Sequence, residues 1–389
     1  MSRKKQNTKK ALVAHIAYRF YGVPTEDDAI LEAKTFGCCR FLWNRMLYDH
    51  NTLYQEIGKV PVNTPADYKD LDECKWLCEV DSLALANVQR NLETAFRRFF
   101  DGISRYPRFK SKKYCKRSYT TNAVYSRGSC NIKLDEEKGR LKLPKHKDWV
   151  QLNMHRNIRP GGTVKSVTVT LEPDGKTYYS ILVEYPKKET SKKVPEKMIG
   201  LDMSLPDLYV DNHGDTPEFT KPYRHMEPVL VKEQKRLSRK KEGSKRYERQ
   251  RVKVAKLHAK AKHQRRDFLH KLSSYLVKNY DLIGIGDLDM SALKKALKFG
   301  KSVSDNGWGM FVQMLEYKSE REGKYLIKID RWFPSSKTCC KCGHVHKELT
   351  LSDRIYICLK CGHVMGRDKQ AAINILNEAV RIWKELSVA

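Results

Sequence analysis

The sequence predicts a multidomain protein that combines an α/β part with a β-rich part, and three observations support this prediction. The chain has 389 residues, which is enough for two or three domains. The runs Val167–Leu171 and Tyr178–Tyr185 are dense in β-branched and aromatic residues, and an Asp-Gly pair at Asp174-Gly175 between them indicates a hairpin turn. Further along, apolar strand patterns alternate with helical ones, which is typical of an α/β layer.

The first half is expected to hold strands on either side of a helical piece. Residues 1–24 and about 106–190 have the composition of strands. Between them a helix is predicted behind an N-cap at Asp81-Ser82. Its apolar residues recur at helical spacing and are interpreted as a packed core face: Leu85, Val88, Leu92, Ala95, Phe96 and Phe99.

The second half opens with an apolar strand, Met198–Leu201, that ends at the carboxylate of Asp202. A second strand, Leu282–Ile285, ends at Gly286-Asp287. A third strand is predicted over Tyr325–Ile329, and the last helix begins near Arg367-Asp368.

The charge of the chain points to a polyanionic partner. Lysine and arginine exceed aspartate and glutamate by 76 − 46 = 30. Such an excess fits nucleic acid better than a small-molecule substrate. No apolar run approaches the roughly 18 residues of a membrane span, and neither a membrane partner nor a secretory signal is expected.

Two stretches concentrate this charge. Residues 232–271 contain 17 lysines and arginines but only four acidic residues, and they are predicted to form one long helix that a polyanion neutralises. The alternative is a solvated helical face. In the second stretch, Arg105–Arg117, aromatic rings alternate with cations and could stack on unpaired bases. These rings could equally pack inward from a strand, and neither stretch distinguishes RNA from DNA. The candidate nucleic-acid contacts are Arg108, Lys110, Lys112, Lys113, Arg236, Arg239, Lys240, Arg246 and Arg249.

Four cysteines have the spacing of a metal site. Cys339-x-x-Cys342 is followed after fifteen residues by Cys358-x-x-Cys361, and a glycine comes directly after each pair. Two such pairs supply four thiolates for tetrahedral Zn²⁺. Four protein ligands leave no open position, so the zinc is predicted to be structural. His344 and His363 lie close enough in sequence to be alternative ligands.

Several segments together resemble the TnpB family of transposon-encoded RNA-guided DNA endonucleases, which are relatives of type V CRISPR effectors. These segments are Lys34–Phe41, Pro107–Lys112, Gly200-Leu201-Asp202, Asp305-x-Gly307-Trp308-Gly309, Pro334–Cys339, the two cysteine pairs and Arg367–Ile375. The resemblance covers nearly the whole chain.

The resemblance implies a fold and partners. The implied fold is a wedge β-barrel (residues 1–24 and 106–190) interrupted by a helical recognition domain (25–105). A RuvC-like (RNase H-like) domain (195–331 and 366–389) with an inserted zinc ribbon (332–365) follows. The implied partners are a guide RNA and a target double-stranded DNA with a short flanking motif. The implied location is the bacterial cytoplasm, at the nucleoid when bound.

The resemblance also implies a nuclease site that this sequence lacks in part. A RuvC-like site uses three carboxylates to hold two Mg²⁺ ions. Asp202 and Asp368 match the first and third carboxylates. The second should be a glutamate, but Gly286 occupies its position. Asp287 is shifted by one residue and would face the other side of the strand unless a bulge intervenes. Gly366 and Gln370 also depart from the family, which usually has Asp and Asn there.

Two main hypotheses follow from these departures. The first is an RNA-guided DNA-binding protein that no longer cuts, like the nuclease-dead TnpB-like repressors. The second is an active TnpB-type endonuclease with an unusual set of metal ligands. Mg²⁺ is expected as a cofactor only under this second hypothesis. A transposase that performs strand exchange and a plain zinc-ribbon DNA-binding protein are weaker alternatives. The guide, the flanking motif, the target gene and the oligomeric state do not follow from the sequence.

Overall fold

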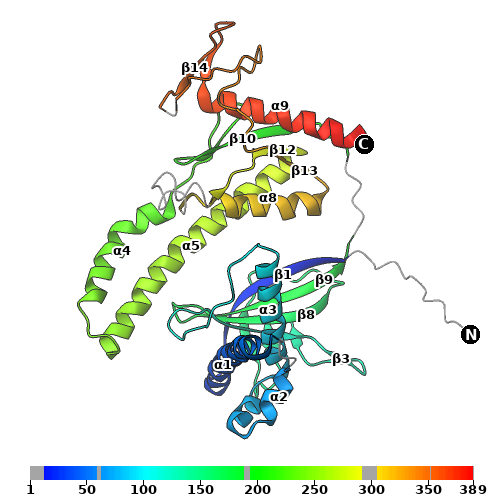
Figure 1. Ribbon diagram of the computed structural model, residues 1–389, viewed down its shortest axis with the longest axis vertical. Coiled ribbons are helices and arrows are strands. Elements are labelled where there is room, and N and C mark those ends of the chain that lie inside the picture. Colours follow the sequence, from blue (N-terminus) through cyan, green and yellow to red (C-terminus); the bar gives the residue numbers. More distant parts are fainter. Residues whose placement is uncertain (1–12, 59–62, 188–192, 291–304, 351, 389) are drawn as a thin grey trace, which may run out of the picture. The chain divides into compact units, whose positions relative to one another are not determined.

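A computed structural model describes residues 13–58, 63–187, 193–290, 305–350 and 352–388. The chain divides into two compact units, Met1–Lys188 and Glu189–Ala389, which are described separately (Figure 1). Residues 1–12 of the predicted first β segment lie outside the described part. Within the described part, no helix is long and apolar enough to cross a membrane.

The first unit is built on one antiparallel sheet of seven strands, in the order β2-β8-β9-β1-β7-β6-β5. The long central strand β1 (Val13–Val23) pairs with β9 on one side and with β7 on the other. The end strands β2 and β5 are not neighbours, so the predicted barrel is present as a curled half-barrel. The other strands are β2 (Arg117–Asn122), β5 (Lys133–Asp135), β6 (Arg140–Lys142), β7 (Val150–Asn153), β8 (Thr163–Leu171) and β9 (Thr177–Pro186), with a separate small hairpin of β3 (Tyr125–Ser126) and β4 (Ser129–Cys130).

The predicted hairpin and helix of this unit are confirmed. The turn between β8 and β9 contains Gly175, whose φ of 85° lies in the left-handed region that glycine tolerates. The helix α3 (Ser82–Phe100) begins behind Asp81, whose side chain accepts from the Leu83 amide, and its predicted apolar face is buried at Leu85, Val88, Leu92 and Phe96. It packs beside α1 (Glu26–Ile57), whose N-cap is Thr25. Two short helices, α2 (Pro65–Asp70) and the 3₁₀ helix η1 (Asp72–Glu79), come between α1 and α3 in sequence.

The second unit contains the predicted α/β layer. Its sheet has the order β11-β10-β12-β13. The strands β10 (Met198–Ser204), β12 (Leu282–Gly286) and β13 (Tyr325–Ile329) are parallel, and β11 (Leu208–Asp211) runs antiparallel to β10. Parallel neighbours require crossover connections, which the long helical segments between these strands supply.

Helices cover both faces of this sheet (Figure 1). On one face, Leu201 and Ile285 pack in a core with α8 (Trp308–Glu322). On the other face lies the last helix, α9 (Arg367–Val388), which begins where it is predicted. It approaches so closely that a Cβ on Gly200 would lie 2.3 Å from the Ala372 carbonyl oxygen. Gly284 is similarly close to Ala379, so both glycines are required by the approach of α9.

The basic stretch 232–271 is not one helix, as the sequence predicts, but belongs to a helical hairpin of α4 (Pro222–Ser238) and α5 (Lys245–Asn279). The reversal occurs at Gly243, whose φ is 82°, and Ser244 then caps α5 by accepting from the Tyr247 amide. Met226 and Leu230 of α4 pack against Ala261 of α5. Charge counting alone does not detect such a turn.

Candidate functional site

The ends of β10 and β12 and the start of α9 form the candidate nuclease site. Side chains alternate between the two faces of a strand. Gly200 and Gly284 face α9, so Asp202 and Gly286, two residues later on each strand, face α9 as well. Asp368 lies in the first turn of α9. The fold therefore brings Asp202, Gly286 and Asp368 to one place.

The two carboxylates affect each other. Burial, followed by the nearby charge of Asp368, raises the pKa of Asp202 to about 7. Asp368 itself lies beside two guanidinium groups, with Arg367 Nη2 at 3.3 Å and Arg354 Nη1 at 3.9 Å from its carboxylate oxygens. The site thus contains two acidic side chains and two basic ones.

The position of the missing glutamate is open. A Cβ built on Gly286 would meet no heavy atom within 4 Å among the described residues beyond its neighbours in the chain. Asp287 follows Ile285 on the opposite face of β12, where Arg331 Nη2 lies 2.8 Å from its carboxylate. Asp287 is thus engaged in an ion pair with Arg331, and the alternation of side chains along β12 predicts that it faces away from Asp202.

The other two departures from the family have separate environments. Gly366 ends β15, and a Cβ there would also meet no described atom within 4 Å. Gln370 is fully buried and donates to the Thr338 carbonyl oxygen at 2.9 Å. Asn374, one turn later, donates to the same oxygen at 2.7 Å. Gln370 therefore connects α9 to the chain just before the first cysteine pair.

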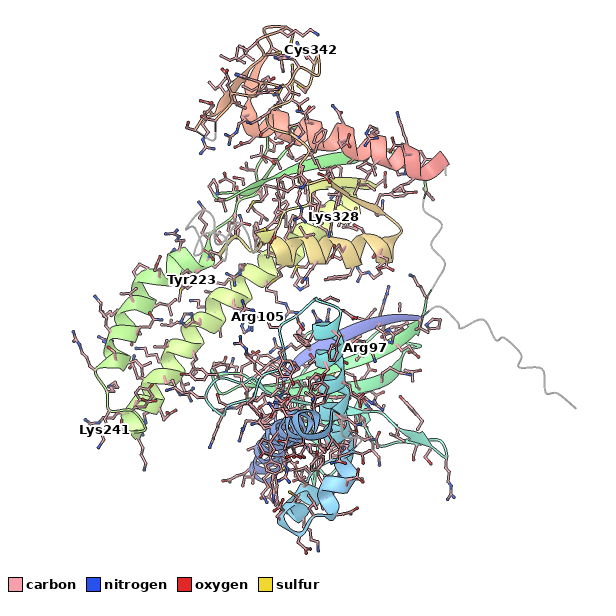
Figure 2. The ribbon with its side chains drawn as sticks, in the orientation of Figure 1. Arg97, Arg105, Tyr223, Lys241, Lys328 and Cys342 are labelled. Carbon is pink, nitrogen blue, oxygen red and sulfur yellow. The ribbon has the colours of Figure 1, made fainter. Side chains whose placement is uncertain are left out.

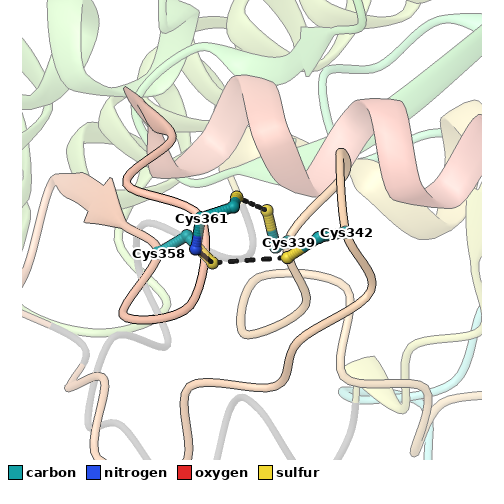
Figure 3. A group of neighbouring side chains, drawn as sticks. All are labelled: Cys339, Cys342, Cys358 and Cys361. Atoms are coloured by element: carbon teal, nitrogen blue, oxygen red, sulfur yellow. Dashed lines mark hydrogen bonds between the residues drawn. The ribbon is translucent and has the colours of Figure 1, made fainter.

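The four cysteines come together at the end of the second unit (Figure 3). Their sulfur atoms all lie within 4.8 Å of one another. The Cys339–Cys361 and Cys342–Cys358 sulfur distances are 3.7 and 3.5 Å. A tetrahedral zinc with Zn–S bonds of about 2.3 Å requires sulfurs about 3.8 Å apart, so the residues present fit this ion.

The two cysteine loops have the same backbone geometry. The Gly343 amide donates to the Cys339 carbonyl, and the Gly362 amide donates to the Cys358 carbonyl, each at 2.9 Å. Both glycines have φ near 70° (72° and 67°), which explains the glycine after each pair. The short strands β14 (Ile355–Ile357) and β15 (Val364–Gly366) complete this segment.

The alternative histidine ligands do not join the sulfur cluster. The group of side chains that satisfies metal-site geometry in the described part of the chain contains the four cysteines and neither His344 nor His363. His363 Nε2 instead lies 3.4 Å from the sulfur of Cys340, the cysteine left over by the pair spacing.

The predicted contacts on the helical hairpin surround its turn, where Lys241 is labelled in Figure 2. Arg236, Arg239, Arg246 and Arg249 are exposed, and Lys240 is half-buried. A buried glutamate, Glu233, holds this end of the hairpin together. Its carboxylate accepts from Gln250 at 2.7 Å and lies 2.8 and 3.2 Å from Arg236 and Lys253.

The other four predicted contacts lie between α3 and β2, in the segment from Asp101 to Lys116, which contains neither helix nor strand. Arg108, Lys112 and Lys113 are exposed. Lys110 is half-buried and lies 3.5 Å from the centre of the Trp43 ring, and burial lowers its pKa. Lys110 therefore differs from Arg108, Lys112 and Lys113, because its ammonium group lies over an aromatic ring while their side chains are exposed.

A buried polar cluster in the first unit has no counterpart in the sequence prediction. The Tyr179 hydroxyl donates to Glu32 at 2.5 Å, and the two ring nitrogens of His146 each lie 3.8 Å from a carboxylate, one of Asp28 and one of Glu32. Burial raises the pKa of Glu32 to about 7 and lowers that of His146. These residues are far apart in sequence, and only the spacing of Asp28 and Glu32 by one helical turn hints at a shared face.

Comparisons with known proteins agree with this architecture. A family model described as "Probable transposase" (OrfB_IS605) matches residues 180–297. A second, described as "Cas12f1-like, TNB domain", matches residues 308–375. A third, described as "Helix-turn-helix domain", matches residues 14–59, which contain β1 and the single long helix α1 here.

Two relatives align over most of their length. A protein of Streptomyces pristinaespiralis named "Putative RNA-guided DNA endonuclease" is 36% identical over 364 residues, which cover 92% of this chain and 87% of the relative. A protein of Escherichia coli K12, "Putative RNA-guided DNA endonuclease InsQ", is 31% identical and covers 92% and 91% of the two chains.

The fold is also similar to that of a solved structure, a Cas12f1–sgRNA–target DNA complex. The TM-score is 0.54 at 12% identity, and the match covers 90% of this chain and 83% of the other. The expected fold class, a β-barrel with a helical insertion followed by a RuvC-like domain with a four-cysteine ribbon, is confirmed by this likeness and by the family models, with the barrel present as a curled half-barrel. Because the identity to the curated relatives extends over more than nine-tenths of its length, the chain belongs to the TnpB family of IS605-type elements.

Proposed function

We propose that this chain is an RNA-guided, double-stranded-DNA-binding protein that does not cut its target and acts as a transcriptional repressor. The single observation that carries this proposal is the pairing of two retained carboxylates, Asp202 and Asp368, with an open glycine position at Gly286. The relatives named as putative RNA-guided DNA endonucleases supply the class of partner, a guide RNA and a matched DNA.

Electrostatics support the loss of cleavage. Two Mg²⁺ ions carry four positive charges, whereas Asp202 and Asp368 carry two negative ones. The guanidinium groups of Arg367 and Arg354 beside Asp368 partly offset the negative charge of these two carboxylates. Metal stabilisation of the transition state amounts to several kcal/mol, and each 1.36 kcal/mol is tenfold in rate. The absence of one ligand should therefore slow cutting by roughly a thousandfold or more.

Binding depends on other parts of the chain. The guide–target heteroduplex reads the sequence, and the protein holds phosphates through basic surfaces. Exposed cations around the α4–α5 turn, among them Arg239, Arg246 and Arg249, are suited to that role. A protein that stays on its target without cutting it blocks polymerase, so repression is the natural use.

We further propose that Cys339, Cys342, Cys358 and Cys361 hold one Zn²⁺ ion with a structural role. Its thiolate ligands would fix the loops that Gln370 and Asn374 connect to α9. All four ligands come from the protein, so the zinc takes no part in phosphodiester chemistry.

The second candidate function is an active endonuclease of the TnpB type that requires Mg²⁺. The retention of Asp202 and Asp368 favours it, and it would need Asp287 as the third ligand. The ion pair between Asp287 and Arg331, on the opposite face of β12, is the observation against it.

The test begins with expression of the chain together with its native flanking DNA. The expected result is a copurified structured RNA with a short guide at one end, whose sequence then defines a matched duplex. The RNA-loaded protein should retain that duplex and should release a control duplex whose sequence does not match the guide. A preparation that stays free of RNA, or that binds both duplexes equally, would overturn the proposal.

A further inference from the structure

The segment Arg105–Lys110, which follows α3, is fixed along α1 by two adjacent side chains. The Trp43 indole Nε1 donates to the Arg108 carbonyl oxygen at 3.0 Å. The Asn44 side chain donates to the Lys110 carbonyl oxygen at 2.9 Å and accepts from the Lys110 amide at 2.7 Å. These bonds satisfy backbone groups that have no strand partner, and they hold the backbone on both sides of Phe109.

The side chains of this fixed segment lie in different environments. Tyr106 is 41% exposed, but it has partners: its hydroxyl donates to Asn51 at 2.5 Å and its ring contacts Phe96 and Phe99 edgewise. Lys110 lies over the Trp43 ring. Phe109, between the two fixed carbonyls, is 57% exposed. An exposed phenylalanine on a firmly held backbone suggests a ligand, since leaving such a ring in water forgoes the benefit of its burial.

The charge around Phe109 identifies the chemistry of that ligand. From Gly102 to Leu134 the sequence has nine lysines and arginines and no carboxylate. Arg108 and Lys112 on either side of Phe109 are exposed, and Tyr114, a second ring four residues after Lys110, is 84% exposed (Figure 2 labels Arg105, where the fixed segment starts). Cations for phosphates beside a bare aromatic face are the features of a site for single-stranded nucleic acid.

We propose that Phe109 is a base-stacking residue: it receives one unpaired nucleobase of a nucleic-acid strand whose flanking phosphates lie on Arg108 and Lys112. Trp43 and Asn44 are positioning residues, because they act through the backbone of the segment. This inference rests on the proposed nucleic-acid-binding function and names one site within it. Lys110, which is engaged with Trp43, contributes no phosphate contact of its own.

The experiment uses the full chain, freed of bound RNA by nuclease and high salt. The probes are a short oligothymidine DNA and a short oligouridine RNA, each with one central 2-aminopurine, whose fluorescence falls when it stacks. Phe109→Leu keeps the apolar bulk and removes the aromatic face. It should weaken binding roughly 5- to 100-fold and abolish the fluorescence decrease. The slope of log affinity against log salt should not change, because no charge is lost.

Three variants separate stacking from general charge and from misfolding. Lys112→Ala should reduce the salt slope by about 0.7, the value for one phosphate of a single strand. Asn44→Ala should weaken stacking although it removes neither a ring nor a cation. Phe100→Leu is the matched control, because Phe100 is 75% exposed but lies at the end of α3 outside the fixed segment, and it should bind normally.

Each outcome decides between stated alternatives. If Phe109→Leu loses affinity and fluorescence quenching with the RNA probe alone, the stacked base belongs to RNA. If it loses them with the DNA probe alone, the base belongs to DNA. If it loses them with both probes, Phe109 stacks on bases of either kind of strand. Unchanged affinity and fluorescence of Phe109→Leu with both probes would overturn the inference and leave Phe109 as a contact for a protein partner. Because no guide or duplex target is used, failure here is distinct from failure of guide-dependent binding.

Discussion

The carboxylate of Asp287 lies 2.8 Å from the guanidinium of Arg331, on the face of β12 opposite to the one that Gly200 and Gly284 present to α9. The ion pair joins the end of β12 to the residues after β13. It occupies the carboxylate nearest in sequence to the missing ligand. We therefore propose that Asp287 does not replace the carboxylate missing at Gly286, and this relationship motivates the proposal of a nuclease site that does not cut.

Gly200→Ala should destabilise the second unit, because the new methyl group would lie 2.3 Å from the Ala372 carbonyl oxygen and α9 would have to shift. Overpacking of this kind costs about 1–3 kcal/mol. Gly286→Ala is the matched control on the same face of the sheet, and open space there should leave the free energy of unfolding nearly unchanged. Urea unfolding of both variants checks this, and equal stability of the two would contradict the described approach of α9.

Cys358→Ser should release the bound zinc, since it removes one of four thiolates in the cluster. Cys340→Ser is the control, because Cys340 faces His363 rather than the cluster. Metal analysis of the purified proteins should give one zinc per chain for the wild type and for Cys340→Ser, and much less for Cys358→Ser. Unchanged zinc in Cys358→Ser would show that another residue completes the site.

Glu32→Gln should change the pH dependence of stability. The pKa of Glu32 in the folded protein is raised from 4.5 to about 7, so its contribution is fully present below pH 4.5 and is lost as pH rises through 7. Glutamine stays neutral and can still accept the Tyr179 hydroxyl. The variant should therefore gain stability relative to wild type between pH 5 and pH 8, by roughly 1–3 kcal/mol given about 1.4 kcal/mol per pKa unit.

The titration of His146 acts in the opposite direction, because its lowered pKa favours the folded state at higher pH. The neighbouring charges, Asp28, Asp81 and Lys142, are the same in both proteins. The difference in melting temperature between Glu32→Gln and wild type at each pH reports the Glu32 contribution together with its interaction with His146, whose Nε2 lies 3.8 Å from the Glu32 carboxylate. A difference that is constant from pH 5 to pH 8 would show that the carboxyl does not titrate in this range.

Glu233→Ala should loosen the basic hairpin. The substitution removes a buried carboxylate that contacts Arg236, Lys253 and Gln250. The contacts with Lys253 and Gln250 join α4 to the first turns of α5, and an alanine side chain cannot make them. Amide hydrogen exchange near the α4–α5 turn should therefore become faster. Glu248→Ala removes an exposed partner of Arg251 and should have little effect, because surface pairs contribute about 0–1 kcal/mol. Equal exchange in the two variants would contradict the role of Glu233.

The sequence predicts those features that depend on local patterns. The α/β layer, the hairpin at Gly175, the helix behind Asp81 and the convergence of four cysteines all follow from periodicity, turn chemistry or spacing. The pairing of Asp202 with Asp368 follows from the family resemblance, and the close packing of the start of α9 on β10 at Gly200 explains it.

Other features depend on contacts between distant segments. The sequence pattern does not reveal the turn at Gly243, because the run of lysines and arginines continues through the turn while the helix ends before it. The fixed segment around Phe109 depends on Trp43 and Asn44, more than sixty residues earlier, and no local signal connects them. The Glu32–His146–Tyr179 cluster is similar, since α1, a loop and β9 meet only after the sheet curls.

Cleavage of a guide-matched duplex, measured side by side for wild type and Gly286→Glu, tests the central claim most directly. The open space at Gly286 admits the side chain, and the glutamate would complete a three-carboxylate site with Asp202 and Asp368. In Mg²⁺ or Mn²⁺ the wild type should retain the duplex without nicking it, while Gly286→Glu should cut it and lose that activity in combination with Asp202→Ala. Cutting by the wild type that Asp202→Ala abolishes would contradict the account and identify an active endonuclease with another third ligand.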